Sequence, residues 1–213
     1  MREALRTLRF NLMRRAGEGA RVFLITSAAP NEGKSTVTAL LAKSIAGLGR
    51  ATLVVDADLR RPSQAERFGV PGDRGLHDLL RTGAGARADE YLHKSASGVI
   101  VLPAGRATQD ASELLSEPHL QDLVREWRET YATVLIDAPP VLAASDTSLL
   151  STLVDGVVVV MASGETVSGE VQRAKTQLED AGAKLIGIVL NKCPETMGGN
   201  PYTPYSATYG ERG

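Results

Sequence analysis

The sequence has little of several features that define large classes of protein. It contains a single cysteine, Cys193, which excludes a disulfide within one chain and a cysteine-based metal cluster, and which suits a reducing compartment. No apolar run approaches the ~20 residues that a membrane-spanning helix needs, and the N-terminal segment is too charged for a signal peptide. The formal net charge of -1 gives no reason to expect bulk nucleic-acid binding. These absences predict a cytoplasmic protein that reaches a membrane only through a partner or a fused segment.

Apolar strands alternate with amphipathic helices along the chain. The 213 residues, 43% of them apolar and 23% charged, suffice for one large domain with a substantial core. We expect strands at 21–27, 51–58, 98–103, 132–137, 156–162 and 184–191, and helices at 3–15, 34–48, 76–81, 112–130, 145–153 and 166–181. Pro118 should kink or break the fourth of these helices, and Ser145 or Asp146 should cap the fifth. The alternation indicates βαβ units and an α/β fold with a mostly parallel central sheet flanked by helices.

The stretch from Ser27 to Thr36 has the composition of a phosphate-binding loop. It follows an apolar run and precedes a helical pattern, which is the setting that such a loop requires. Backbone N–H groups at a helix N-terminus can surround a phosphate, and Gly33 lets the backbone come close. Lys34 would place an ammonium near the β and γ oxygens, and Ser35 would offer a hydroxyl to Mg²⁺. The usual motif begins with glycine, where this chain has Ala28.

Acidic residues close two of the predicted strands. Asp56 and Asp58 follow one apolar run, and Asp137 follows another. Ligands of parallel sheets bind at the carboxyl ends of the strands, so these carboxylates should lie beside the phosphate-binding loop. A nucleotide site needs acids to hold Mg²⁺ or its waters, and a phosphotransferase needs one to accept a proton. Together with the loop, the two strand ends predict a site that hydrolyses or transfers the phosphates of ATP or GTP.

The two ends of the chain carry features of their own. Glu3, Arg6 and Arg9 are spaced by three along the first predicted helix, which fits either a solvated charged face or a contact with another protein. After Pro194, glycine and proline argue against regular structure. Three of the chain's five tyrosines stand there, namely Tyr202, Tyr205 and Tyr209. Composition alone leaves open whether this tail docks on a domain or is a modification site.

The ordered motifs resemble those of bacterial protein-tyrosine kinases, the P-loop family tied to capsule and exopolysaccharide export. Residues 28–35 are similar to the family's Walker A loop. Residues 53–62, Leu-Val-Val-Asp-Ala-Asp-Leu-Arg-Arg-Pro, resemble its Walker A′ motif, and residues 134–140 resemble its Walker B motif. The charged triplet of the first helix matches its N-terminal oligomerisation signature, and the tail tyrosines resemble its autophosphorylation cluster. The resemblance implies a P-loop NTPase fold of the deviant-Walker kind, like that of septum-site ATPases.

The resemblance also implies a role for each site residue, with ATP and Mg²⁺ as cofactors. Lys34 would bind phosphate, and Asp56 would accept the tyrosine proton, because free tyrosine has a pKa near ~10 and a positioned carboxylate helps it ionise. Ser35, Asp58 and Asp137 would hold Mg²⁺, the two acids mainly through water. The predicted ATP-binding residues are Ala29, Pro30, Asn31, Glu32, Gly33, Lys34, Ser35, Thr36, Asn191 and Lys192, of which the last two would meet the base.

The same resemblance implies an assembly. Residues 1–195 would form the kinase domain, with the helix at 3–15 for oligomerisation, and residues 196–213 would form a flexible tyrosine-rich tail. Subunits in a ring would phosphorylate one another's tails, with Arg60 and Arg61 steering the tail. Each phosphate adds about -1.5 to -2 charges, which disfavours a packed tail and would open the ring. A transmembrane activator of the polysaccharide co-polymerase kind, separate or fused, would hold the kinase at the inner face of the membrane.

Two other functions fit parts of the same pattern. ATPase switches that position septa or plasmids share the fold, the loop and the Walker A′ acids, but they usually carry a second lysine early in the loop. This chain has Ser27, Ala28 and Ala29 there, and the switches have no need of a tyrosine tail. A scaffold that binds nucleotide only to assemble is the other alternative. Iron–sulfur carrier ATPases of the same fold are disfavoured by the single cysteine.

Overall fold

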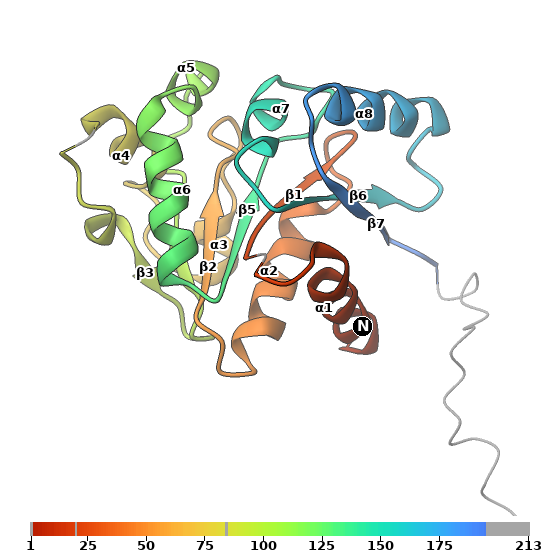
Figure 1. The fold of residues 1–213 in the computed structure, drawn as a ribbon, viewed down its shortest axis with the longest axis horizontal. Coiled ribbons are helices and arrows are strands. Elements are labelled where there is room, and N and C mark those ends of the chain that lie inside the picture. The colour runs from red at the N-terminus through yellow and green to blue at the C-terminus, as the bar shows by residue number, and fades with distance from the viewer. Residues whose placement is uncertain (1, 20, 84, 195–213) are drawn as a thin grey trace, which may run out of the picture.

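The computed structural model describes residues 2–19, 21–83 and 85–194. Its helices are α1 (Arg2–Ala16), α2 (Lys34–Ala46), α3 (Gln64–Phe68), α4 (Leu76–Thr82), the 3-10 helix η1 (Ala88–Tyr91), α5 (Ala111–Leu115), α6 (Pro118–Thr130), α7 (Asp146–Ser151) and α8 (Ser168–Asp180). Its strands are β1 (Val22–Ser27), β2 (Thr52–Asp56), β3 (His93–Lys94), β4 (Ile100–Leu102), β5 (Thr133–Asp137), β6 (Gly156–Ala162) and β7 (Leu185–Asn191). Strands and helices alternate along most of the chain (Figure 1), as the sequence predicts.

Within the described residues, the strands form one seven-stranded sheet in the order β3-β4-β2-β5-β1-β6-β7. Neighbouring strands are parallel, except that β3 runs antiparallel to β4. Strand β5 lies between β1 and β2, and its register pairs Asp137 with Asp56 on one side and with Ile25 on the other. The carboxyl ends of these three strands therefore meet at one edge of the sheet, and two of the predicted site acids are direct neighbours there.

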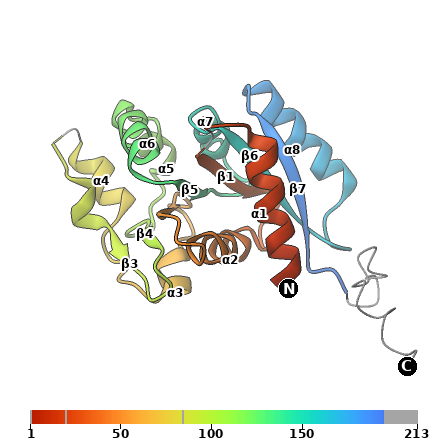
Figure 2. The ribbon, with the colours of Figure 1, turned by 60° about the horizontal axis from the view of Figure 1, so that its bottom comes forward.

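Helices cover both faces of the sheet, which gives three layers; Figure 2 shows α2 and α3 on one side of the strands and α4, α6 and α7 on the other. Successive residues of a strand point to opposite faces. Leu53 and Val55 accordingly join one core, while Val54 joins the other. Strands β1, β2 and β5 are buried at every position, which is typical of parallel strands covered on both faces.

The predicted strands and the longer predicted helices are confirmed, with boundaries that differ by a few residues. The break expected near Pro118 is also confirmed: α5 ends at Leu115, and Pro118 is the first residue of α6, where a helix does not need its missing N–H. Ser145 is the N-cap residue of α7, but no side-chain hydrogen bond caps that helix. Helix α3 and the antiparallel strand β3 were not expected, and α3 proves important for the site.

Helix α1 packs along α2 and the edge strand β7. The face of α1 toward these elements is apolar, since Leu12 is buried and Leu8 packs against the same core. Arg9 turns toward α2, and its Nη1 donates hydrogen bonds to the carbonyl oxygen and the hydroxyl of Ser44, at 2.8 and 3.1 Å. Arg9, one of the three predicted oligomerisation residues, therefore forms its hydrogen bonds within its own chain.

The predicted tail, residues 196–213, lies outside the described residues, and so do Tyr202, Tyr205 and Tyr209. Among the described helices, none combines the length and the apolar character that crossing a bilayer requires.

Candidate active site

The loop between β1 and α2 has the strand–loop–helix geometry predicted for it. Its backbone adopts positive φ angles at Asn31 (66°) and Gly33 (95°). A Cβ at position 33 would lie 2.1 Å from Nδ2 of Asn191, far inside van der Waals contact. Position 33 therefore favours glycine, because of its left-handed conformation and because any larger side chain would displace the amide of Asn191. Lys34 and Ser35 follow as the first residues of α2, where backbone N–H groups face outward.

The Lys34 ammonium is the centre of the site. Its Nζ lies 2.9 Å from Oδ2 of Asp58 and 3.4 Å from Oδ1 of Asp137. It also lies 3.1 Å from the hydroxyl of Ser35. These oxygens come from the segment after β2, from the end of β5 and from the start of α2. The expectation that the strand-end acids lie beside the phosphate-binding loop is therefore confirmed.

Charge in this cluster is unbalanced, because the three buried acids Asp56, Asp58 and Asp137 surround one lysine. Burial acts to lower the pKa of Lys34, but the attraction of Asp137 and Asp58 outweighs it, and the pKa lies above its ordinary value. Burial and the negative charge of Asp137 raise the pKa of Asp56 to about 7, against the opposing effect of hydrogen bonds from backbone N–H groups and of Lys34. A carboxyl group with a pKa near neutrality can accept a proton and release it again under the same conditions.

Gln64 holds both strand-end acids, and the sequence analysis did not single it out. It is the first residue of α3 and is fully buried. Its Nε2 donates to Oδ2 of Asp137 at 2.7 Å and to the carbonyl of Ser35 at 3.1 Å. The backbone N–H groups of Ser63 and Gln64 both donate to Oδ2 of Asp56 at 2.8 Å. The sequence signal, a polar residue after Arg-Arg-Pro-Ser, is too common in loops to have identified it.

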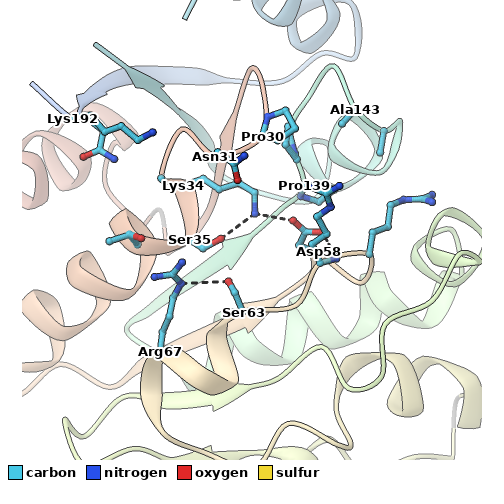
Figure 3. A pocket seen from close by; sticks show the side chains of 17 residues that line it. Pro30, Asn31, Lys34, Ser35, Asp58, Ser63, Arg67, Pro139, Ala143 and Lys192 are labelled. Carbon is cyan, nitrogen blue, oxygen red and sulfur yellow. Dashed lines mark hydrogen bonds and ion pairs between the residues drawn. The ribbon is translucent and has the colours of Figure 1, made fainter. Parts of the chain in front are cut away.

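A cavity of about 610 Å³ opens beside these groups, a size typical of small-molecule sites. Figure 3 shows Lys34 reaching from the loop toward Asp58, with Ser35 beside it. Nine predicted residues line the cavity, namely Pro30, Asn31, Gly33, Lys34, Ser35, Thr36, Asp58, Asn191 and Lys192. The rest of the wall consists of Arg60, Arg61, Ser63, Arg67, Pro139, Pro140, Ala143 and Ala144. Four other predicted residues are not among those that line it, namely Ala29, Glu32, Asp56 and Asp137, and the last three are buried.

Glu32 supports the loop from behind. Its carboxylate is buried and accepts hydrogen bonds from the backbone N–H of Ala29, at 2.8 Å, and from the hydroxyl of Thr166, in the loop after β6. The side-chain amide of Asn191 donates to the Glu32 carbonyl at 3.0 Å. These contacts give the Glu32 carboxylate a role in shaping the loop, while its predicted contact with nucleotide stays a prediction.

The two arginines of the Walker A′ segment have different surroundings. Nε of Arg60 lies 3.1 Å from Oδ2 of the buried Asp146, and its Nη2 donates to the hydroxyl of Ser112 at 3.1 Å. Ser112 in turn donates to Asp146. This network ties the segment after β2 to α5 and α7, so Arg60 acts first as an anchor. Arg61 is exposed at the rim of the cavity, which leaves it as the better placed of the two to meet an anionic peptide.

The oxygen donors suit Mg²⁺ but do not form a complete cage. The hydroxyl of Ser35 and the carboxylates of Asp58 and Asp137 gather around one point, the Lys34 ammonium, and hard oxygen ligands are those that Mg²⁺ prefers. In the part of the chain that the structure describes, no group of three or more His, Cys, Asp or Glu side chains is arranged to hold a metal by itself. The arrangement fits an ion held partly by nucleotide phosphates and water.

Comparison with known proteins points to one family. A family model described as "NUBPL iron-transfer P-loop NTPase" matches residues 19–197. The tyrosine-protein kinase CpsD of Streptococcus agalactiae is 30% identical over 199 residues, which are 93% of this chain and 82% of CpsD. The tyrosine-protein kinase YwqD of Bacillus subtilis is 34% identical over 191 residues, which are 89% of this chain and 80% of YwqD.

Solved structures agree with these relatives. The kinase domain of Escherichia coli tyrosine kinase ETK superposes with a TM-score of 0.85 and 31% identity, covering 89% of this chain and 74% of that domain. The cell division ATPase MinD of Pyrococcus furiosus superposes less closely, with a TM-score of 0.68 and 25% identity over 80% of this chain and 71% of MinD. The deviant-Walker fold class is thus confirmed, and the kinase relatives match more of the chain and match it better. The chain therefore belongs to the bacterial tyrosine-protein kinase family of P-loop NTPases.

Proposed function

We propose that this chain is an ATP-dependent autokinase that phosphorylates its own C-terminal tyrosines, Tyr202, Tyr205 and Tyr209. The observation that carries the proposal is the arrangement around Lys34, whose ammonium lies within 3.4 Å of an oxygen of Ser35, of Asp58 and of Asp137, beside the cavity. Phosphoryl transfer depends mainly on positioning and on neutralising charge. A lysine, a helix N-terminus and metal-binding oxygens supply both at one point.

The phosphate-binding loop would bind the triphosphate. Backbone N–H groups of residues 33–36 would surround the β phosphate, and Lys34 would turn from the acids to the β and γ oxygens. Ser35 would bind Mg²⁺ directly, with Asp58 and Asp137 acting mainly through water, and the ion would neutralise charge on the phosphate oxygens. Asn191 and Lys192, which also line the cavity, would meet the adenine base.

The transfer itself would be an in-line displacement. The phenol oxygen of the acceptor tyrosine attacks the γ phosphorus, the bond to the β–γ bridging oxygen breaks, ADP leaves, and the phenol proton passes to Asp56. Asp56 suits this role because burial and the charge of Asp137 raise its pKa to about 7. Since Asp56 is buried and is not among the residues that line the cavity, we propose that the segment 58–63 shifts when the acceptor binds.

We place the reaction between subunits. Tyr202 follows the cavity residue Lys192 by ten positions, which span at most about 33–36 Å when extended, so chain length permits transfer in cis as well. The test mixes a full-length Lys34→Met chain with an active chain whose three tail tyrosines are phenylalanine, in labelled ATP and Mg²⁺. Label on the tail of the Lys34→Met chain supports transfer in trans. An unlabelled tail there, together with labelling of the unmodified chain, would assign the reaction to one subunit.

We also propose that the chain assembles with copies of itself and with a transmembrane activator of polysaccharide export, at the inner face of the membrane. Glu3 and Arg6 support the first part, because both side chains are exposed on α1, where a second copy can reach them. The second part is what the resemblance of the sequence motifs to bacterial protein-tyrosine kinases implies. Sedimentation of the native chain and of an Arg6→Ala variant tests the self-association, which the substitution should weaken.

An ATPase switch of the septum-positioning kind is a second candidate, favoured by the MinD-like fold. Such a protein would hydrolyse ATP without forming phosphotyrosine, whereas a nucleotide-dependent scaffold would bind ATP and assemble without hydrolysing it. Measuring phosphotyrosine and released phosphate in one reaction separates the three functions.

A further inference from the structure

Gln64 is a buried neutral side chain that contacts both the metal-binding and the phosphate-binding parts of the site. It is fully buried at the start of α3, and its Nε2 bridges Oδ2 of Asp137 (2.7 Å) and the carbonyl of Ser35 (3.1 Å). Its own backbone N–H is bound to Asp56 at 2.8 Å. One residue thus joins the end of β2, the end of β5 and the first turn of α2.

The direction of the Gln64 amide is fixed by its partners. An amide NH₂ has two hydrogens, and both partners of Nε2 are oxygens that only accept when Asp137 is ionised. The opposite amide orientation would bring Oε1 against those two acceptors. In the described residues Oε1 has no hydrogen-bond partner, so the side chain keeps an orientation that leaves its acceptor unpaired in order to donate twice.

This contact divides the two oxygens of the Asp137 carboxylate between two neighbours. Oδ2 is held by Gln64 at 2.7 Å, and Oδ1 faces Lys34 at 3.4 Å. These two contacts fix the plane of the Asp137 carboxylate. They leave Oδ1 facing Lys34 and Ser35, where a metal-bound nucleotide would sit. Because glutamine is neutral, it does this without adding a charge to a cluster that already holds three acids and one lysine.

We propose that Gln64 is a positioning residue, which orients Asp137 and the first turn of α2 so that Mg²⁺ and the γ phosphate are held in the geometry of transfer. The inference rests on the proposed function for its kinetic consequence. Its structural consequence, the orientation of a carboxylate toward Mg²⁺, does not require a tyrosine acceptor. Residues that orient metal ligands typically contribute 10–100-fold to metal affinity or activity.

The test compares Gln64→Met with Gln177→Met in the full chain. Methionine keeps the length of glutamine and removes its donor. Gln177 is a matched control, because its Nε2 also donates to a backbone carbonyl and to a side chain, those of Val141 and Ser148, at 3.2 and 3.1 Å, away from the acids. Four quantities are measured: the unfolding temperature without nucleotide, the Mg²⁺ concentration needed for half-maximal binding of a fluorescent ADP, and kcat and KM for tail phosphorylation.

We expect the unfolding temperatures of the two variants to agree within a few degrees. We expect Gln64→Met to need at least about tenfold more Mg²⁺ than Gln177→Met, and to lose at least about tenfold in kcat with KM for ATP changed less than about threefold. Gln64→Glu, which places an acceptor against Asp137, should have a larger effect than Gln64→Met. Equal Mg²⁺ requirements in Gln64→Met and Gln177→Met would overturn the proposal.

Two further outcomes are informative. If Gln64→Met does not fold, Gln64→Asn is used instead, because it keeps the amide but withdraws it from Asp137; failure of both to fold would make Gln64 a determinant of the fold and overturn the positioning role. If the unmodified chain binds Mg²⁺ and ADP but never forms phosphotyrosine, the proposed function fails. The Mg²⁺ comparison still decides the role of Gln64 in that case.

Discussion

Carboxylates at the two edges of the sheet have different surroundings. At the amino edge, Asp155 accepts hydrogen bonds from the backbone N–H groups of Arg21 and Val22, at 2.7 and 2.8 Å, and forms an ion pair with Arg128 of α6. At the carboxyl edge, the ammonium of Lys34 lies against both Asp58 and Asp137, and the third buried acid, Asp56, accepts hydrogen bonds from the backbone N–H groups of Ser63 and Gln64. Asp155 thus has the guanidinium of Arg128 as its counter-ion, whereas Asp58 and Asp137 share one ammonium.

The pKa values follow this difference. Burial acts to raise the pKa of Asp155, but hydrogen bonds from Arg128, Val22 and Arg21 outweigh it, and the pKa lies below its ordinary value. The pKa of Asp56, in contrast, rises to about 7. The amino edge is therefore arranged for stability. The carboxyl edge keeps an excess of negative charge, which suits a site that must receive a metal ion and a phosphate.

The largest expected effect comes from removing the cation of the carboxyl edge. Lys34→Met should lower tail phosphorylation by at least about 10³-fold, because Lys34 supplies the ammonium that lies against Asp58 and Asp137, where the phosphates would bind. The variant should also unfold at a lower temperature than the native chain, since three acids then repel one another without compensation. Kinetics with labelled ATP and calorimetry measure the two effects; unchanged phosphorylation would mean that Lys34 is not at the reacting phosphate.

Asp56→Asn separates function from stability at the same edge. Phosphorylation should fall by about 10²–10⁴-fold if Asp56 is the general base. Because the pKa of Asp56 is raised in the folded chain to about 7 from an ordinary value of 3.8, ionisation of Asp56 makes the fold progressively less stable as pH rises from 3.8 to about 7. The variant should therefore be more stable than the native chain at pH 8, and this advantage should vanish at pH values below 3.8.

The same carboxyl gives a kinetic signature. In the native chain, kcat/KM for ATP should rise with pH through about 7, as Asp56 ionises in the free enzyme. Asp56→Asn should flatten this limb of the profile. A limb that persists in the variant would assign the titration to another group.

Asp155→Asn should have the opposite effects to Asp56→Asn: it should lower stability and leave phosphorylation nearly unchanged. We expect a loss of about 1–2 kcal/mol in the free energy of unfolding at pH 7, after allowance for solvent screening at this partly exposed site, and phosphorylation within about twofold of the native rate. Because the pKa of Asp155 is lowered in the folded chain, its contribution is present above the ordinary value of 3.8 and disappears as pH falls through the folded pKa. Denaturant titrations at pH 7 and at pH 3 measure this contribution. An equal loss of unfolding free energy at both pH values would show that the ionised form of Asp155 is not what stabilises the fold.

The smallest expected effect concerns the support behind the loop. Thr166→Val removes the hydroxyl that donates to the buried Glu32 carboxylate while keeping the shape of the side chain. We expect KM for ATP to rise about two- to fivefold with kcat unchanged, because the loop loses one contact but no group that faces the reaction. A fall in kcat at unchanged KM would show that Glu32 takes a more direct part.

The sequence predicts those parts of the site whose signal is local. Lys34 and Ser35 stand in a recognisable loop, and Asp56 and Asp137 end apolar strands, so their meeting follows from parallel pairing. Gln64 and Thr166 could not be found in this way. Gln64 contacts an acid 73 positions away, Thr166 contacts one 134 positions away, and α3 has only five residues, too few for a helical period to show.

The fold follows the same rule. The fully buried strands β1, β2 and β5 can be recognised from their apolar composition. The two-residue strand β3 cannot, because it forms only by pairing with β4. The inward turn of Arg9 toward Ser44 was equally hidden, because its spacing from Glu3 and Arg6 suggests a shared outer face.

Mapping the phosphorylated residues tests most directly whether Lys34 serves transfer to the tail tyrosines. The full chain is incubated with labelled ATP and Mg²⁺, and phosphorylated residues are mapped in the native chain and in Lys34→Met. We expect phosphotyrosine at one or more of Tyr202, Tyr205 and Tyr209 in the native chain and at least about 10³-fold less in the variant. ATP turnover with no phosphotyrosine, or equal labelling of the two chains, would contradict this expectation.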